Sequence, residues 1–205
     1  NISLIYYFFN DILDTNRGEY MRNIITLAGD LGSGKGTVSN ILEKELNYTI
    51  YRNGEYFRSL AKEKGMSVSA FCDYVDMHPE IDRSIEESAR EYAKNHDNLI
   101  IDARLGWYVV PDSFKVYLKV DIDEAARRAF NDPNRKATES FNTVLEQKQD
   151  MIKRQHSENT RYKTLYHVDN LDMSNYDLVI DTTYITPDEV ADIILDRYKK
   201  RFIDM

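Results

Sequence analysis

The sequence predicts an α/β fold in which a parallel sheet of about five strands carries helices on both faces. Short apolar runs of strand length alternate along the chain with longer segments of helical periodicity. Strands that alternate with helices in this way form parallel sheets covered on both sides. No internal repeat or low-complexity stretch interrupts the alternation, so a single folded domain is expected.

Five segments are predicted as strands because each is short and mostly apolar, as buried parallel strands are. They are residues 23–28, 48–51, 99–101, 114–118 and 178–180. The first strand leads directly into Gly29 and a glycine-rich loop.

The segments between these strands have helical patterns. They are residues 37–46, 55–64, 67–76, 80–95, 123–130 and 140–161, followed by a last helix after residue 186. The last helix has the clearest start, since Thr186 can cap it, Pro187 suits its first position and Glu189 completes a capping box. Residues 132–136 break the pattern and predict a short lid.

Composition narrows the class of protein. The 205 residues are 42% hydrophobic and 30% charged, values typical of a globular protein. No apolar run is long enough to span a membrane, and the net charge of −8 argues against a nucleic-acid partner. A single cysteine, Cys72, cannot form an internal disulfide, which fits a reducing, cytoplasmic location.

Residues 1–20 differ from the rest of the sequence and are interpreted as an extension or tag-like segment outside a domain of residues 21–205.

A glycine-rich loop between the first strand and the first helix is the strongest functional signal. Backbone N–H groups in such a loop wrap phosphate oxygens, and the positive end of the helix adds to them. The loop residues expected to bind ATP are Gly29, Asp30, Leu31, Gly32, Ser33, Gly34, Lys35, Gly36 and Thr37. We expect Lys35 to supply a positive charge beside the phosphate oxygens that become more negative as a phosphoryl group is transferred. The alternative is an ordinary glycine turn. The flanking strand and helix favour a P-loop NTPase-type fold.

The carboxyl ends of two further strands carry candidates for an acceptor site, because ligands bind at this edge of open parallel sheets. Arg58 lies one turn into the helix after the second strand, and Asp102 and Arg104 follow the third. We expect the two arginines to bind the phosphate or base of an acceptor, and Asp102 to hold a magnesium-bound water. A surface role for Arg58 and a turn-capping role for Asp102 remain alternatives.

Charged residues near the end of the long predicted helix share one face. Arg154, Glu158 and Arg161 stand at helical spacing, which suits a site for an anionic substrate but equally a solvated ion pair. Arg128 and Arg135 flank the predicted lid, where arginines neutralise a transferring phosphoryl group after closure.

Taken together, these segments resemble the cytidylate kinase family, most closely its short archaeal-type branch, over residues 24–195. The resemblance lies in the loop at 29–37, in Asn-Gly-Glu-Tyr-Phe-Arg at 53–58, and in the strand end at 101–104. It lies also in the Arg154, Glu158 and Arg161 face and in residues 179–183. Ala103 stands where the family usually has glycine, which adds a methyl group close to the acceptor site.

The resemblance implies transfer of the γ-phosphoryl group of ATP to CMP or dCMP, with Mg²⁺ as cofactor, small-molecule nucleotides as substrates, and neither a nucleic acid nor a membrane as partner. It implies that Lys35, Arg128, Arg135 and Arg154 act in catalysis, and that Arg58, Asp102, Arg104, Arg154, Glu158 and Arg161 bind the acceptor. Gly36 stands directly after Lys35, with Thr37 next, so Mg²⁺ is expected near Thr37 and Asp102 largely through water.

Two other readings remain open. A different small-molecule P-loop kinase, acting on adenylate, shikimate or dephospho-coenzyme A, would share the loop. The short lid argues against long-lid adenylate kinases. A nucleotide-binding module without turnover would share the fold, although Lys35, Arg58 and Asp102 are all present and a guanine-binding Asn-Lys-x-Asp signature is absent.

Overall fold

The computed structural model describes residues 22–133 and 141–201. The expected extension at residues 1–20 and the lid candidate Arg135 lie outside the described residues.

A five-stranded sheet forms the centre of the molecule. Its strands are β1 (Ile24–Gly29), β2 (Thr49–Arg52), β3 (Leu99–Asp102), β4 (Phe114–Lys119) and β5 (Leu178–Asp181). Their order in the sheet is β2-β3-β1-β4-β5, and every neighbouring pair is parallel. This confirms the predicted parallel sheet of about five strands.

The helices that the structure describes follow the predicted alternation. They are α2 (Lys35–Leu46), α3 (Asn53–Glu63), α4 (Val68–Asp76), α5 (Pro79–Lys94), α6 (Gly106–Val109), α7 (Ile122–Asn131), α8 (Val144–Tyr166) and α9 (Pro187–Lys200). A short 3₁₀ helix, Met173–Asn175, precedes β5.

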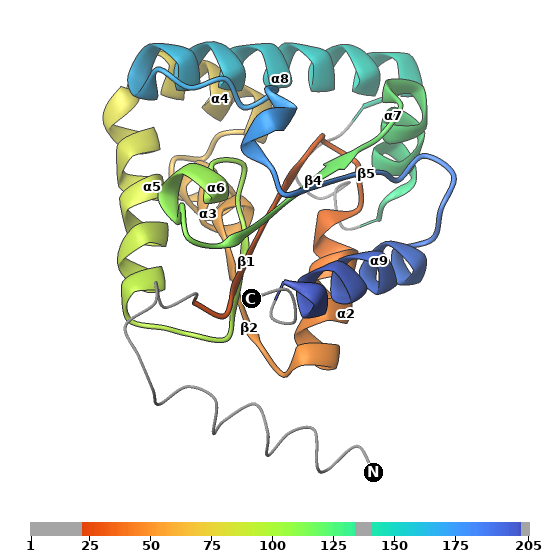
Figure 1. The fold of residues 1–205 in the computed structure, drawn as a ribbon. Coiled ribbons are helices and arrows are strands. Elements are labelled where there is room, and N and C mark those ends of the chain that lie inside the picture. The colour runs from red at the N-terminus through yellow and green to blue at the C-terminus, as the bar shows by residue number, and fades with distance from the viewer. Residues whose placement is uncertain (1–21, 134–140, 202–205) are drawn as a thin grey trace.

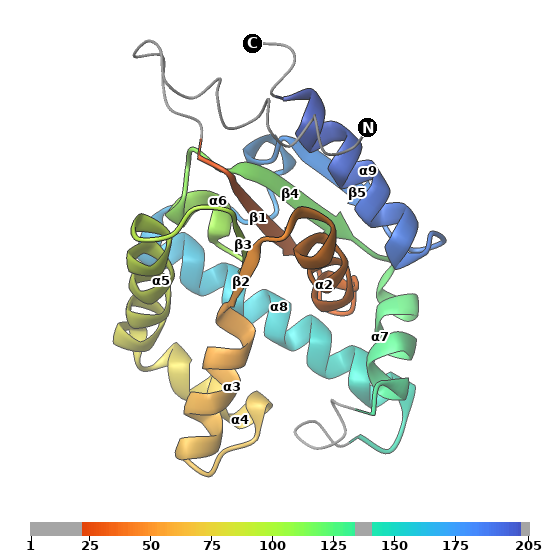
Figure 2. The ribbon, with the colours of Figure 1, turned by 90° about the horizontal axis from the view of Figure 1, so that it is seen from below.

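Both faces of the sheet are covered, as Figures 1 and 2 show. Ile25 of β1 packs in one core with Val38 of α2 and Ile194 of α9. Its neighbour Ile24 packs on the opposite side with Ala89 of α5 and Tyr162 of α8. Because successive strand residues point to opposite faces, a strand buried on both sides reads as continuously apolar, which is why β1 was recognisable from sequence.

The long helix α8 crosses the molecule and links its two ends (Figure 2). It packs against α4 near one end and against α7 near the other. Helices α3, α4 and α5 lie on one side of the molecule, and α7 and α9 lie on the other (Figure 2).

The structure differs most from the prediction at two helices. Helix α6, one turn long, was not predicted, and its Gly106 packs so closely that an added Cβ would lie 3.0 Å from Cβ of Thr26. Helix α8 begins at Val144 rather than 140, because Thr143 caps it by accepting from the backbone N–H of Glu146. It ends at Tyr166 rather than 161, where His167 adopts a left-handed conformation with φ of 58°.

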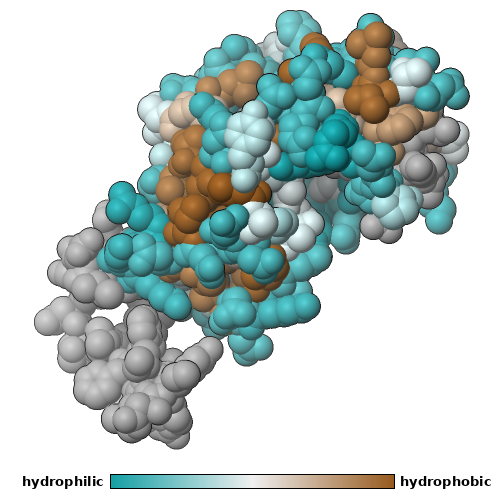
Figure 3. Space-filling view, turned by 90° about the vertical axis from the view of Figure 1, so that its right-hand side faces the viewer, coloured by the Kyte–Doolittle hydropathy of each residue, from teal (hydrophilic) through white to brown (hydrophobic). Residues whose placement is uncertain are grey.

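Within the described residues, no helix is both long enough and apolar enough to cross a membrane. Figure 3 views the side of the molecule that carries β5 and α9, and shows an apolar area bordered by polar side chains. Val179 of β5 and Ile193 of α9 are among the exposed large hydrophobic residues.

Candidate active site

One cleft of about 820 Å³ opens at the carboxyl ends of the strands. The glycine loop, Arg128 and the start of α9 line one end of it. Residues of α3, α4 and α5 line the other end, and Asp102, Arg104 and α8 lie between them. The cleft therefore brings together the glycine loop and the residues that the sequence analysis predicted for an acceptor site.

The glycine loop needs glycine where its backbone passes its neighbours. Gly29 has a φ of 151°, and an added Cβ would lie 2.4 Å from the carbonyl oxygen of Leu118. Gly32 has a φ of 79°, and its Cβ would lie 2.7 Å from the carbonyl oxygen of Ala125. The loop can take this path against β4 and α7 only without side chains at these two positions.

The charge of Lys35 is placed at the mouth of this loop. Its Nζ donates to the carbonyl oxygens of Gly29 at 2.9 Å and Asp30 at 3.0 Å. Lys35 is also the first residue of α2, so its ammonium group and the positive end of the helix lie together. Gly34, Gly36 and Thr37 line the cleft beside it.

The side chains of Asp30 and Ser33 support the loop from behind. Asp30 accepts from the Tyr117 hydroxyl at 2.7 Å, from the Val120 N–H at 3.1 Å and from Gln155 at 3.1 Å. The Ser33 hydroxyl donates to the carbonyl oxygen of Asp30 at 2.9 Å. The structure therefore places the Asp30 carboxylate away from the cleft, where it joins the loop to β4 and α8.

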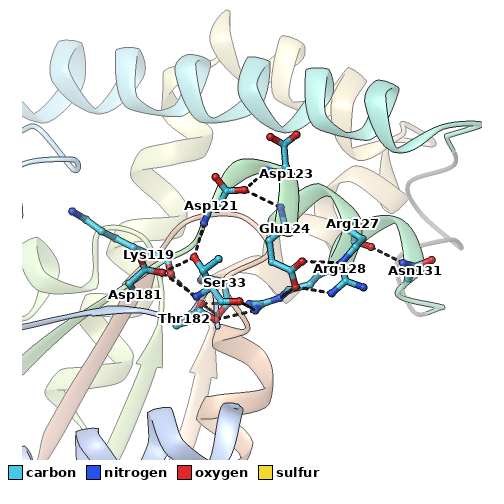
Figure 4. A network of polar contacts seen from close by, with 11 residues as sticks. Ser33, Lys119, Asp121, Asp123, Glu124, Arg127, Arg128, Asn131, Asp181 and Thr182 are labelled. Atoms are coloured by element: carbon cyan, nitrogen blue, oxygen red, sulfur yellow. Dashed lines mark hydrogen bonds and ion pairs between the residues drawn. The ribbon is translucent and has the colours of Figure 1, made fainter. Parts of the chain in front are cut away.

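A second set of polar contacts ties Arg128 to the loop after β5 (Figure 4). Arg128 donates to the carbonyl oxygens of Thr182 at 2.8 Å and Thr183 at 3.0 Å, and pairs with Glu124 at 2.8 Å. The Thr182 hydroxyl contacts the carbonyl oxygen of Ser33 at 3.1 Å. Arg128 thus lines the cleft and holds the loop after β5, and Thr182 in turn joins that loop to the glycine loop.

Asp102, at the end of β3, lies among the cations of the cleft. Burial raises the pKa of its carboxyl, and the charges of Lys35, Arg52, Arg104 and Arg58 oppose that rise. The carboxylate therefore lies within electrostatic reach of both Lys35 and the arginines Arg58 and Arg104.

Arg104 and Glu158 form the central ion pair of the cleft. Nε of Arg104 lies 2.5 Å from Oε2 of Glu158, and both side chains are largely buried. Arg154, one turn earlier on α8, is 8% exposed and also lines the cleft.

Arg161 forms ion pairs with carboxylates from two other helices. Its Nε donates to Asp82 at 2.7 Å and its Nη1 donates to Asp76 at 2.6 Å. Arg154, Glu158 and Arg161 do share one buried face of α8, so the solvated-helix alternative is wrong for all three. The observed pairing gives Arg161 a structural task in joining α4, α5 and α8.

Arg58 differs from these residues in being exposed. It lines the cleft from α3 and makes no hydrogen bond or ion pair with the described residues. Its guanidinium group approaches the position where a Cβ on Gly54 would stand, at 3.4 Å. It is available to an anionic ligand without breaking an existing contact.

Sequence reasoning missed Asn53, Asp82 and Glu86, which line the end of the cleft formed by α3 and α5 and are at most 8% exposed. A signal was present for the two acidic residues. They share helical spacing with Ile85 and Ala89 of the buried stripe of α5, where a carboxylate is unusual.

Three comparisons place the chain among known proteins. A cytidylate kinase from Thermoplasma volcanium is 37% identical over 178 residues, covering 84% of this chain and 90% of that protein. An S-adenosylmethionine-dependent nucleotide dehydratase from Lacinutrix mariniflava is 35% identical over 181 residues, covering 88% of this chain but 37% of that protein. The fold of a shikimate kinase from Acinetobacter baumannii, solved with shikimate, matches with a TM-score of 0.57 at 16% identity, over 89% of this chain and 96% of that one.

The shikimate kinase similarity concerns the fold alone. The sequence similarity is more specific, since residues 24–184 match the cytidylate kinase-like family. This chain therefore belongs to the cytidylate kinase-like family.

Proposed function

We propose that this protein transfers the γ-phosphoryl group of ATP to a nucleoside monophosphate, with CMP or dCMP as the preferred acceptor, giving the diphosphate and ADP. The observation that carries the proposal is one cleft that joins the glycine loop to the buried arginines Arg104 and Arg154. Transfer between two anions requires cations on both sides of the reacting group, and this cleft supplies them.

The donor end suits ATP. The backbone of residues 29–34 and the start of α2 offer N–H groups to the β- and γ-phosphates. Lys35 adds charge at the transferring group, and the pocket between Arg128 and the Ile185–Pro187 segment is open to the base. The family relationship supports ATP as donor, since several relatives that match most of this chain are named cytidylate kinase.

The acceptor end suits a nucleotide rather than an uncharged alcohol. Arg58, Arg104 and Arg154 line it and can neutralise the acceptor phosphate. The phosphate oxygen that attacks is already ionised at neutral pH, so the chain needs no general base for this step. The residues of the cleft therefore act by orienting the two anions, neutralising their charge and excluding water.

The site also fits Mg²⁺ brought in with ATP. Thr37 and Asp102 both line the cleft and offer the oxygen ligands that Mg²⁺ prefers. No group of three or more His, Cys, Asp or Glu side chains within residues 22–133 and 141–201 is arranged to hold a metal ion. A site of this kind relies on phosphate oxygens and water for most of the ligands, and the ion would neutralise charge on the transferring phosphates.

The deciding experiment measures ADP release from ATP with a panel of acceptors: CMP, dCMP, UMP, AMP, shikimate and dephospho-coenzyme A. We expect the highest kcat/KM with CMP or dCMP. Discrimination against AMP should exceed discrimination against UMP, because the pyrimidine rings have the same size. Faster turnover of AMP or shikimate would contradict the cytidylate assignment and leave a P-loop kinase of another specificity.

A further inference from the structure

The acceptor end of the cleft contains a polar pair that the reaction itself does not use. Asn53 is the first residue of α3, and Glu86 belongs to α5. Nδ2 of Asn53 donates to Oε2 of Glu86 at 3.4 Å, a contact between residues 33 positions apart. Both line the cleft, and they are 8% and 5% exposed.

Asn53 has an unused acceptor at this position. Its Oδ1 is buried and has no hydrogen-bond partner in the described part of the chain. Leaving a buried acceptor unpaired costs about 1–3 kcal/mol, so such atoms in folded proteins usually await a ligand or a water. Because Nδ2 faces Glu86, Oδ1 is the amide atom left for a ligand.

The Glu86 carboxyl group also has capacity left to bind a ligand. Within the described residues it forms no ion pair, and Asn53 is its hydrogen-bond partner. Burial, and then the like charge of Asp82, raise the pKa of Glu86 to about 8. At neutral pH the carboxyl is therefore neutral and carries one donor and one acceptor.

The surroundings of this pair have the shape of a base site. Phe57, Val68 and Ile85 supply apolar surface to the same end of the cleft. Arg58, one turn along α3 from Asn53, can hold the phosphate of the same ligand. Apolar walls with a few convergent polar atoms are the usual composition of a small-molecule pocket.

We propose that Asn53 and Glu86 form the base-recognition subsite of the acceptor and select a pyrimidine that carries an exocyclic amino group. This inference rests on the proposed nucleoside monophosphate kinase function. The amino group of cytosine donates to Oδ1 of Asn53 and to the carbonyl oxygen of Glu86, whose hydroxyl donates to N3. Uracil would instead turn its O4 toward Oδ1 of Asn53, and two acceptors would meet without a hydrogen.

Ionisation of Glu86 should weaken this selection. The titratable and charged groups around it are Asp82 and Arg90 of α5 and Arg161, Tyr162 and Tyr166 of α8. Arg161 already pairs with Asp82, and burial raises the pKa of both tyrosines, so they stay neutral. An ionised Glu86 would repel N3 of cytosine but accept from N3–H of uracil.

The experiment compares kcat/KM for CMP and UMP in the full-length protein, as wild type and as Asn53→Ala and Glu86→Gln variants. Asn53→Ala should lower the CMP-to-UMP ratio by about tenfold, because it removes the acceptor that distinguishes the bases. The KM for ATP serves as the internal check of folding. Glu87→Gln, an exposed neighbour on α5 that pairs with Arg90, is the matched control and should leave the ratio unchanged.

The second arm follows the ratio between pH 6.5 and 9. In the wild type it should fall as Glu86 ionises near pH 8, and in Glu86→Gln it should stay level, because glutamine keeps one donor and one acceptor at all these values. Equal losses for CMP and UMP in Asn53→Ala, or a Glu86→Gln profile identical to the wild type, would overturn the inference alone. A wild type that phosphorylates neither pyrimidine nucleotide would overturn the proposed function and the inference together.

Discussion

The ammonium group of Lys35 is held by the carbonyl oxygens of the loop that it serves. Replacing Lys35 by Ala should lower kcat by roughly 10²–10⁴, the range seen when a preorganised charge at a developing anion is removed. Steady-state kinetics with ATP and CMP measure the loss. Lys44→Ala, an exposed residue in the last turn of the same helix, is the control. Near-normal turnover in Lys35→Ala would contradict the role given to the glycine loop.

Arg58 lines the opposite end of the cleft and forms no hydrogen bond or ion pair with the described residues. Arg58→Ala should raise the KM for CMP much more than the KM for ATP, since it removes charge from the acceptor side alone. Separate titrations of the two substrates give both constants. Lys62→Ala, an exposed residue on α3, provides the comparison. Equal increases in both constants would remove Arg58 from the acceptor site.

Glu86 should also leave a mark on stability. Its pKa is raised from 4.5 to about 8 in the folded chain, mainly by burial. Between those pH values the folded chain keeps a proton that the unfolded chain has released, so stability falls as pH rises through this window. Glu86→Gln should flatten that fall, and Glu87→Gln should keep it. Chemical denaturation at a series of pH values measures the difference, and parallel profiles for wild type and Glu86→Gln would refute it.

At the scale of elements, two glycines of the loop have different roles: Gly29 is needed for packing, and Gly36 lines the cleft. Gly29→Ala drives a Cβ into the backbone of Leu118, so it should lower stability by about 1–3 kcal/mol. Gly36→Ala meets nothing within 4 Å and lies inside α2, so stability should hold or rise by up to ~1 kcal/mol. Because Gly36 lines the cleft, the same variant should bind ATP more weakly. Denaturant melts and ATP titrations of both variants check this; equal stability losses would contradict the assignment.

The loop and the sheet were predictable because their signals are local in sequence. Strand, glycine loop and helix follow one another within residues 24–46, and each buried strand is a continuous apolar run. The bounds of α8 were harder to predict, because the helix ends where His167 adopts a left-handed conformation, which the residue type alone does not indicate.

Pairings across long sequence distances were not predictable. Asn53 meets Glu86 across 33 positions, and Arg161 meets Asp82 across 79. The charges at 154, 158 and 161 were seen to share a face, but the partners that bury that face lie on other elements. The sequence therefore located the arginines of the site, but it did not show which of them pair with carboxylates of the protein itself.

At the scale of the whole molecule, α8 connects the two ends of the cleft. It contacts α4 near the acceptor end and α7 near the donor end, and its Gln155 reaches the carboxylate of Asp30 behind the glycine loop. The same helix contributes Arg154 and Glu158 to the cleft itself. Helix α8 thus connects the two ends of the cleft to which the proposed donor and acceptor are assigned.

The central claim is that this protein moves a phosphoryl group from ATP to CMP rather than to water. The most direct test is ³¹P NMR of the protein with ATP, Mg²⁺ and CMP, which resolves nucleoside diphosphates from inorganic phosphate. The account predicts that CDP and ADP appear in equal amounts with little inorganic phosphate. Formation of ADP with an equal amount of inorganic phosphate, and no CDP, would contradict it.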